Sequence, residues 1–213
     1  MKGIFITFEG PDGAGKTSVL EEVLPRLQMV AKAPLVKTRE PGGIPIAEKI
    51  RTIILDPKNT AMDERTEALL YAASRRQHLV QKVLPALMEG KIVLCDRFVD
   101  SSLAYQGAGR RIGMEAIAAI NEFATEGTVP DATIYLDVDS DTGLERIARS
   151  RKHDVDRLDT ESPEFHQRVR HAYLKIAEQN PQRVIQIDAR MRLEEVVEAT
   201  YQAIVQRFPE YFA

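Results

Sequence analysis

The segment at residues 10–17 restricts the fold of this chain more than any other part of the sequence. It reads Gly-Pro-Asp-Gly-Ala-Gly-Lys-Thr, which matches G-x-x-x-x-G-K-[ST], and it lies between an apolar run and a helical one. In that setting, glycines let successive backbone N–H groups surround an anion at the start of a helix. The segment therefore predicts a phosphate-binding loop for a nucleoside triphosphate, placed between a strand and a helix.

The residue types in this loop predict separate tasks. The Lys16 ammonium would reach the β- and γ-phosphates, and the Thr17 hydroxyl would bind Mg²⁺. A GTPase is disfavoured, because the string nearest to the guanine-reading [NT]-K-x-D element, residues 151–154, begins with arginine. The residues expected to hold the triphosphate are Gly10, Pro11, Asp12, Gly13, Ala14, Gly15, Lys16 and Thr17.

Short apolar runs alternate with longer amphipathic ones along the rest of the chain. The expected strands are 3–8, 35–38, 92–95, 133–137 and 184–187, and the expected helices are 16–30, 63–89, 114–126, 142–150 and 163–178. A last helix is expected from one apolar face, formed by Leu193, Val196, Val197, Thr200, Ile204, Val205 and Phe208. Alternation of this kind predicts the α/β class, with a doubly wound five-stranded parallel sheet flanked by helices.

Length and charge limit the remaining possibilities. With 213 residues, one domain spanning 1–213 is expected, since domains hold roughly 150 residues. The formal charge of −3 gives no overall basic surface for nucleic acid or an anionic membrane, so anions must be bound locally. No apolar run approaches the ~20 residues that span a bilayer, and the N-terminus lacks a signal-peptide pattern, so we expect a cytoplasmic protein.

Arginines at two further strand ends predict a second anion site facing the first. Arg39 follows the run 35–38, and Asp96 and Arg97 follow the run 92–95. An arginine at the open end of a strand can bind a phosphate through two N–H groups. Asp96 stands where a magnesium-positioning carboxylate belongs in phosphate-loop enzymes, although the pair taken alone could be a structural salt bridge.

Two further segments carry groups that could bind a nucleoside. Tyr71 and Arg75 lie four residues apart on one helical face and could stack on a base and bind its edge. Taken alone, the pair reads more simply as core packing plus a surface charge. The segment 100–107 contains Ser102 and Gln106, and an amide can both donate to and accept from a pyrimidine edge.

Together these stretches resemble the thymidylate kinase family of P-loop nucleoside monophosphate kinases, in its bacterial-type branch. The matching stretches are 8–17, 38–43, 71–76, 96–107, 156–159 and 187–189, in the order found in that family. The resemblance implies a P-loop NTPase fold with a lid, and phosphorylation of dTMP to dTDP by ATP and Mg²⁺ in dTTP biosynthesis. It also implies a homodimer.

The resemblance also assigns roles to individual residues. Arg39 and Arg97 would bind the acceptor phosphate, and Asp12 would contact the sugar 3′-hydroxyl. Tyr71 would stack on thymine and Tyr105 would crowd the 2′ position. The residues that would line the base pocket or read its edge are Arg75, Ser102 and Gln106. Catalysis would rest on Lys16, Asp96, Arg97 and a lid arginine, with Thr17 and Asp96 holding the metal.

Two positions depart from the family pattern. Tyr71 stands where the family usually has phenylalanine, and Gly13 stands where one branch carries an arginine. Without that arginine, the transition-state cation must come from elsewhere, and the expected source is the lid, at about 146–160. The candidates are Arg146, Arg149, Arg151 and Arg157, of which we expect Arg149. The main alternative function is a kinase for another pyrimidine nucleotide or for a deoxynucleoside.

Overall fold

The computed structural model describes residues 2–150, 157–158 and 161–213. Most of the expected lid segment, including Arg151, therefore lies outside the described residues. The described part holds five strands, and no strand end differs from the expected one by more than one residue. They are β1 (Ile4–Glu9), β2 (Leu35–Arg39), β3 (Ile92–Asp96), β4 (Ala132–Asp137) and β5 (Val184–Asp188).

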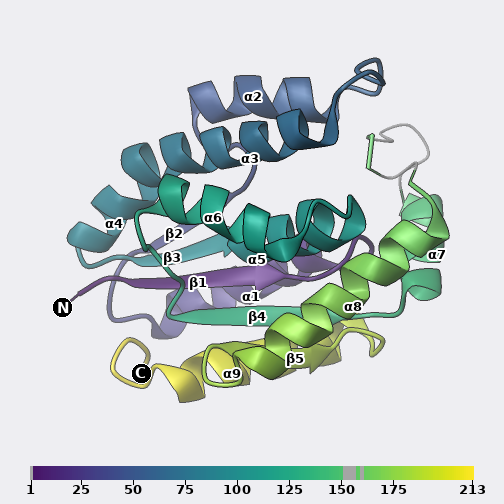
Figure 1. Cartoon of the computed structure of the whole chain (residues 1–213). Coiled ribbons are helices and arrows are strands. Elements are labelled where there is room, and N and C mark those ends of the chain that lie inside the picture. Colours follow the sequence, from purple (N-terminus) through teal and green to yellow (C-terminus); the bar gives the residue numbers. More distant parts are fainter. Residues whose placement is uncertain (1, 151–156, 159–160) are drawn as a thin grey trace.

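The strands form one sheet in the order β2-β3-β1-β4-β5 (Figure 1). Every neighbouring pair is parallel, and Thr7 of β1 lies opposite Cys95 of β3 and Thr133 of β4. The predicted doubly wound α/β fold is confirmed. Because parallel strands end at the same edge, the loops after β1, β2 and β3 meet beyond their carboxyl ends.

Helices cover both faces of the sheet (Figure 1). They are α1 (Lys16–Val30), α2 (Pro45–Leu55), α3 (Glu64–His78), α4 (Leu84–Met88), α5 (Val99–Ser102), α6 (Met114–Thr125), α7 (Ser140–Ser150), α8 (Pro163–Gln179) and α9 (Leu193–Arg207). Two π-helical turns, η1 (Leu79–Val83) and η2 (Leu103–Gly109), join them. Strand alternation divides the core: Ile4 and Ile6 pack with α1 and α9, whereas Phe5 packs with η1 on the other face.

The prediction of a single helix over 63–89 is wrong in one respect. The segment is helical, but it is divided into α3, the π-helical turn η1 and α4. Pro85 lies in the first turn of α4. It has no N–H to donate to the carbonyl of Gln81, and its ring would clash there in a regular helix, so the π-helical turn gives the chain the extra room.

Three other expectations from the sequence were incomplete or wrong. The helix α2 was not predicted, although Pro45 at its first turn and Glu48 just after it are typical of a helix N-terminus. The segment 100–107, for which the sequence predicts hydrogen-bonding groups but no secondary structure, lies in the helical stretches Val99–Ser102 and Leu103–Gly109. Leu193 was expected on the buried face of the last helix, but it is 41% exposed. Among the described helices, none is long and apolar enough to cross a membrane.

Candidate active site

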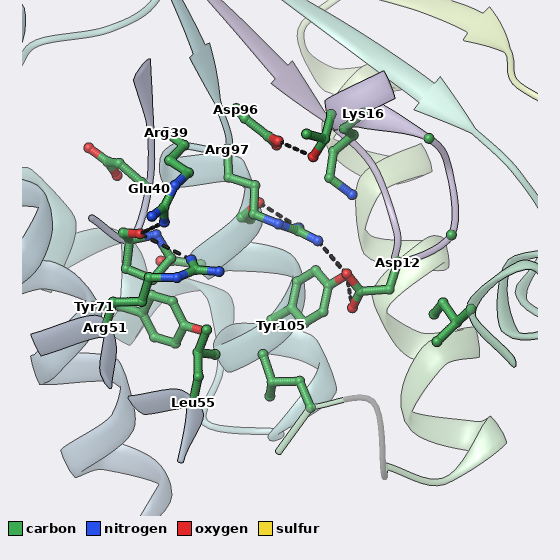
Figure 2. A pocket seen from close by; sticks show the side chains of 18 of the residues that line it. Asp12, Lys16, Arg39, Glu40, Arg51, Leu55, Tyr71, Asp96, Arg97 and Tyr105 are labelled. Atoms are coloured by element: carbon green, nitrogen blue, oxygen red, sulfur yellow. Dashed lines mark hydrogen bonds and ion pairs between the residues drawn. The ribbon is translucent and has the colours of Figure 1, made fainter. Parts of the chain in front are cut away.

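One cavity of about 500 Å³ opens at the carboxyl ends of β1, β2 and β3. Figure 2 shows side chains from the loop after β1, from the ends of β2 and β3 and from the helices α2 and α3 around it. The predicted residues that line it are Asp12, Gly13, Gly15, Lys16, Thr17, Arg39, Tyr71, Arg75, Asp96, Arg97, Ser102, Tyr105 and Gln106. The structure thus brings both expected anion sites and the expected base pocket to one cavity.

The Lys16 side chain folds back onto the backbone of the phosphate-binding loop. The Lys16 Nζ donates to the carbonyl oxygens of Gly10 and Pro11, both at 2.9 Å. Burial, followed by the charge of Arg97, lowers the pKa of Lys16 to about 8, against the opposing effect of Asp12 and Asp96. An anion that binds in the loop would therefore lie close to the buried Lys16 ammonium.

Thr17 and Asp96 join the loop to the end of β3. The Thr17 hydroxyl donates to Asp96 Oδ2 at 2.8 Å. The other oxygen, Asp96 Oδ1, is buried and accepts no hydrogen bond from the described residues. A buried carboxylate oxygen without a partner is costly in a protein, and a hydroxyl beside it makes a suitable ligand pair for Mg²⁺.

Asp12, Arg97 and Tyr105 form a closed triangle over the cavity (Figure 2). Arg97 Nη2 donates to Asp12 Oδ1 at 2.5 Å, and the Tyr105 hydroxyl donates to Asp12 Oδ2 at 2.7 Å. The Arg97 guanidinium also lies over the Tyr105 ring, 5.0 Å from its centroid. Three expected substrate-binding residues therefore hold one another in place.

A buried carboxylate that sequence reasoning missed lies beneath Arg97. Glu9 accepts hydrogen bonds from the Phe98 N–H and the Ser101 hydroxyl, both at 2.6 Å, and from the Tyr173 hydroxyl at 2.9 Å. Burial, followed by the charge of Asp100, raises the pKa of Glu9. These bonds fix the turn after β3, where Arg97 has the unusual φ of 70°. A lone carboxylate at the end of an apolar strand was the available signal.

Arg75 is not a surface charge, so the simpler reading of that residue is wrong. Its side chain is 2% exposed and forms an ion pair with Glu40 at 2.7 Å. It also donates to the Ser102 hydroxyl at 3.0 Å and the Phe98 carbonyl at 2.9 Å, as well as to the Asn121 side chain. Glu40 was missed, and it holds Arg75 at the edge of the cavity.

Arg39 and Arg51 bring two guanidinium groups to the mouth of the cavity (Figure 2). Arg39 Nη2 donates to both carboxylate oxygens of Glu48 at 2.9 Å, and Arg39 Nη1 donates to the Pro41 carbonyl at 3.0 Å. Arg51 Nη1 donates to the same Pro41 carbonyl at 3.1 Å. Arg51 was missed because it belongs to the unpredicted helix α2.

Among the lid candidates, Arg146 rather than Arg149 lines the cavity. Arg146 Nη1 donates to the Ala189 carbonyl at 2.9 Å and the Gly13 carbonyl at 3.4 Å. Arg149 is 81% exposed and pairs with Glu145 at 3.3 Å. Arg157 forms an ion pair with Glu67, away from the phosphate-binding loop.

Gly13 lies directly against the backbone of α7. Its φ is 78°, and a Cβ atom built on it would overlap the carbonyl of Gly143. In return, a Cβ on Gly143 would lie 2.6 Å from the Asp12 carbonyl oxygen. A side chain at position 13 is therefore incompatible with this placement of α7.

Known proteins resemble this chain along its whole length. A family model described as "Thymidylate kinase" matches residues 8–200. A thymidylate kinase from Enterococcus faecalis is 74% identical over 212 residues and one from Lacticaseibacillus casei is 59% identical over 213, each comparison covering both chains entirely. A crystal structure of thymidylate kinase from Ehrlichia chaffeensis has a TM-score of 0.76 and 32% identity, over 96% of this chain and 99% of that one. The chain belongs to the thymidylate kinase family.

Proposed function

We propose that the protein transfers the γ-phosphoryl group of ATP to dTMP, giving dTDP and ADP for dTTP biosynthesis. The observation that carries the proposal is the single cavity in which a phosphate-binding loop faces a second cationic site and a buried donor–acceptor pocket. Family membership supports the same reaction. With ATP as the donor, the proposal places the enzyme in the cytoplasm.

The acceptor nucleotide would lie between the mouth of the cavity and its buried end. Its phosphate would bind Arg39 and Arg97, and the sugar 3′-hydroxyl would contact Asp12. Tyr105, held against Asp12 by its hydroxyl, would leave no room for a 2′-hydroxyl. Its thymine would stack on Tyr71 and reach Arg75, Ser102 and Gln106, which line the buried end.

Chemistry would then consist of positioning and charge neutralisation. The dTMP phosphate oxygen is itself the nucleophile, so no covalent protein intermediate is needed. Lys16 and Arg97 would neutralise charge on the transferring group from two sides. Thr17 and Asp96 would hold Mg²⁺, which supplies charge stabilisation to the β- and γ-phosphates when it is bound. Among the described residues, no group of three or more His, Cys, Asp or Glu side chains could hold a metal ion.

Two arginines of α7 are candidates for the additional cation. Arg149 keeps the role expected from the sequence, but α7 would have to turn or shift to bring this exposed side chain to the phosphates. Arg146 lines the cavity without such a movement. Single alanine substitutions separate them, because loss of the transition-state cation should lower kcat about 10³-fold while changing the KM for dTMP little. Loss confined to Arg146→Ala would reject the role of Arg149.

A panel of acceptors tests the proposed reaction. The purified protein is assayed with ATP and Mg²⁺ on dTMP, UMP, dCMP and thymidine, and dTMP is expected to be the best acceptor by a wide margin. Equal rates on dTMP and UMP, or a faster reaction with thymidine, would favour the alternative kinase. As a control, Lys16→Ala should fold normally and lose most activity on every acceptor, because the loop is common to all of these reactions.

We also propose that the protein forms a homodimer. Large apolar side chains are exposed on three helices that pack in the order α2, α3, α6: they are Ile46, Ile53, Leu69 and Phe123. Figure 1 shows these helices in one layer on the same side of the sheet. Large apolar side chains exposed on helices that pack against one another are typical of a protein interface. Sedimentation velocity should give twice the chain mass, and Phe123→Ser should shift the protein toward monomer.

A further inference from the structure

A buried carboxylate, Glu67, lies behind the base end of the cavity and has no part in the chemistry described above. Its side chain is 0% exposed. Three side chains donate to it: the Gln106 amide at 2.7 Å, the Arg110 guanidinium at 3.1 Å and the Arg157 guanidinium. Full burial is expensive for an acid unless several donors satisfy it, so this arrangement is well defined.

Glu67 decides which end of the Gln106 amide faces the cavity. An amide has a donating nitrogen and an accepting oxygen, whereas an ionised carboxylate only accepts. The bond between Gln106 Nε2 and Glu67 Oε1 therefore commits the nitrogen to the interior. No described residue donates to Gln106 Oε1, and Gln106 lines the cavity, so the pocket is offered an acceptor.

Arg75 supplies the opposite partner at the same end of the cavity. A guanidinium has five N–H groups and no acceptor. Four of the five bonds are made within the protein, to Glu40, Ser102, Asn121 and the Phe98 carbonyl. Among the described residues none accepts from the second hydrogen of Nη2. The buried end of the cavity thus presents one donor, from Arg75, and one acceptor, from Gln106.

The donor from Arg75 and the acceptor from Gln106 distinguish pyrimidines by the groups at their 4-position and at N3. Thymine and uracil carry an accepting O4 beside a donating N3–H, which complements a donor and an acceptor. Cytosine carries a donating amino group beside an accepting N3. Its amino group would therefore face the Arg75 donor, and its N3 would face the Gln106 acceptor. Because a buried polar group without a partner is costly, a mismatched base is strongly rejected.

We propose that Glu67 is a positioning residue that fixes the Gln106 amide so that the pocket accepts thymine and rejects cytosine. The proposal rests on the proposed function, because it assumes that the base of the acceptor lies between Tyr71 and Gln106. Glu67 touches no substrate and acts only through Gln106. In its absence the amide could turn over and present its nitrogen to the accepting N3 of cytosine.

The test compares dTMP with 5-methyl-dCMP, which keeps the 5-methyl group and the shape and reverses only the hydrogen-bonding edge. The measured quantity is the ratio of kcat/KM for the two acceptors. In Glu67→Gln the new amide can donate as well as accept, so either orientation of Gln106 is satisfied. The ratio should fall roughly ten- to hundredfold, through a higher KM for dTMP with kcat little changed.

Two matched variants separate positioning from general damage. Glu67→Asp keeps the negative charge that pairs with Arg110 and Arg157, but the shorter side chain no longer reaches the Gln106 amide. The same fall in the ratio of kcat/KM values is therefore expected. Gln106→Leu removes the amide altogether, and adding Glu67→Gln to it should change the ratio no further. A folded Glu67 variant with an unchanged ratio, or a further loss in the double variant, overturns the proposal.

The proposed function fails in a different way. If the unaltered protein phosphorylates dTMP and 5-methyl-dCMP equally well, then the thymine pocket itself is wrongly placed. If the unaltered protein discriminates and Gln106→Leu abolishes the discrimination while Glu67→Gln keeps it, the pocket stands and the role of Glu67 is rejected. Thermal unfolding of each variant identifies any that do not fold.

Discussion

Lys16 should take up a proton when the phosphate-binding loop binds ATP above neutral pH. In the free protein its pKa is lowered from 10.5 to about 8 by burial and by Arg97. That difference corresponds to a cost on the order of 3 kcal/mol for keeping the buried ammonium charged. The phosphates of ATP would offset this cost, because an opposite charge in contact favours the ionised form and raises the pKa again.

The size of the effect follows from the free-state pKa. Proton uptake on binding should be about 0.1 at pH 7, about 0.5 at pH 8 and about 0.9 at pH 9, since only the neutral fraction of Lys16 must gain a proton. Because ATP binds the protonated form of Lys16, the affinity for ATP should fall as the pH rises through 8. Above that pH the affinity should fall about tenfold for each further pH unit. Above pH 8 the phosphates of ATP are fully ionised and add no protons of their own.

Isothermal titration calorimetry in two buffers of different ionisation enthalpy measures the uptake directly. Lys16→Arg is the matched control, because a guanidinium stays charged throughout this range and should bind ATP with no proton uptake. The reasoning is refuted if the unaltered protein binds ATP at pH 9 without taking up protons. A pH dependence shared by Lys16→Arg would assign the titration to another group.

Two further substitutions test the loop and its metal site. Asp96→Asn keeps the bond to Thr17 possible but removes the buried charge, so the Mg²⁺ concentration for half-maximal activity should rise at least tenfold, measured by titrating the metal. Gly13→Ala and Gly15→Ala both strain a positive φ, but only at position 13 does a Cβ overlap Gly143, whereas nothing lies within 4 Å at position 15. Gly13→Ala should therefore lower the free energy of unfolding by about 1–3 kcal/mol more than Gly15→Ala in urea titrations. Equal losses would show that α7 moves aside freely.

The parts of the site that could be predicted from sequence are those set by short segments. Residues 10–17 predict their own loop and helix, and Asp96 and Arg97 follow an apolar run that forms a strand. A short continuous run of apolar side chains such as Ile4, Phe5 and Ile6 is sufficient to predict a buried strand. These predictions depend on residues that are neighbours in the chain, so a local pattern contains them.

The buried ion pairs could not be predicted in the same way. Arg75 looks like a surface charge because its partner Glu40 lies 35 residues away in sequence. Glu67 stands in a helix rich in charged residues and looks solvated, while Gln106 is 39 residues further along the chain. Which lid arginine reaches the cavity depends on how α7 packs on the loop. Each of these contacts depends on packing between segments that are distant in the sequence, so a local sequence pattern cannot predict it.

The contact between Gly13 and Gly143 also limits how this enzyme could change over evolutionary time. A loop arginine at position 13 and α7 in its present place would occupy the same volume. A single substitution at position 13 would therefore displace α7 together with Arg146 and Arg149, the two arginines proposed as the additional cation. On the proposed mechanism, a lineage with this contact can move the additional cation from α7 to the loop only by first separating the helix from the loop.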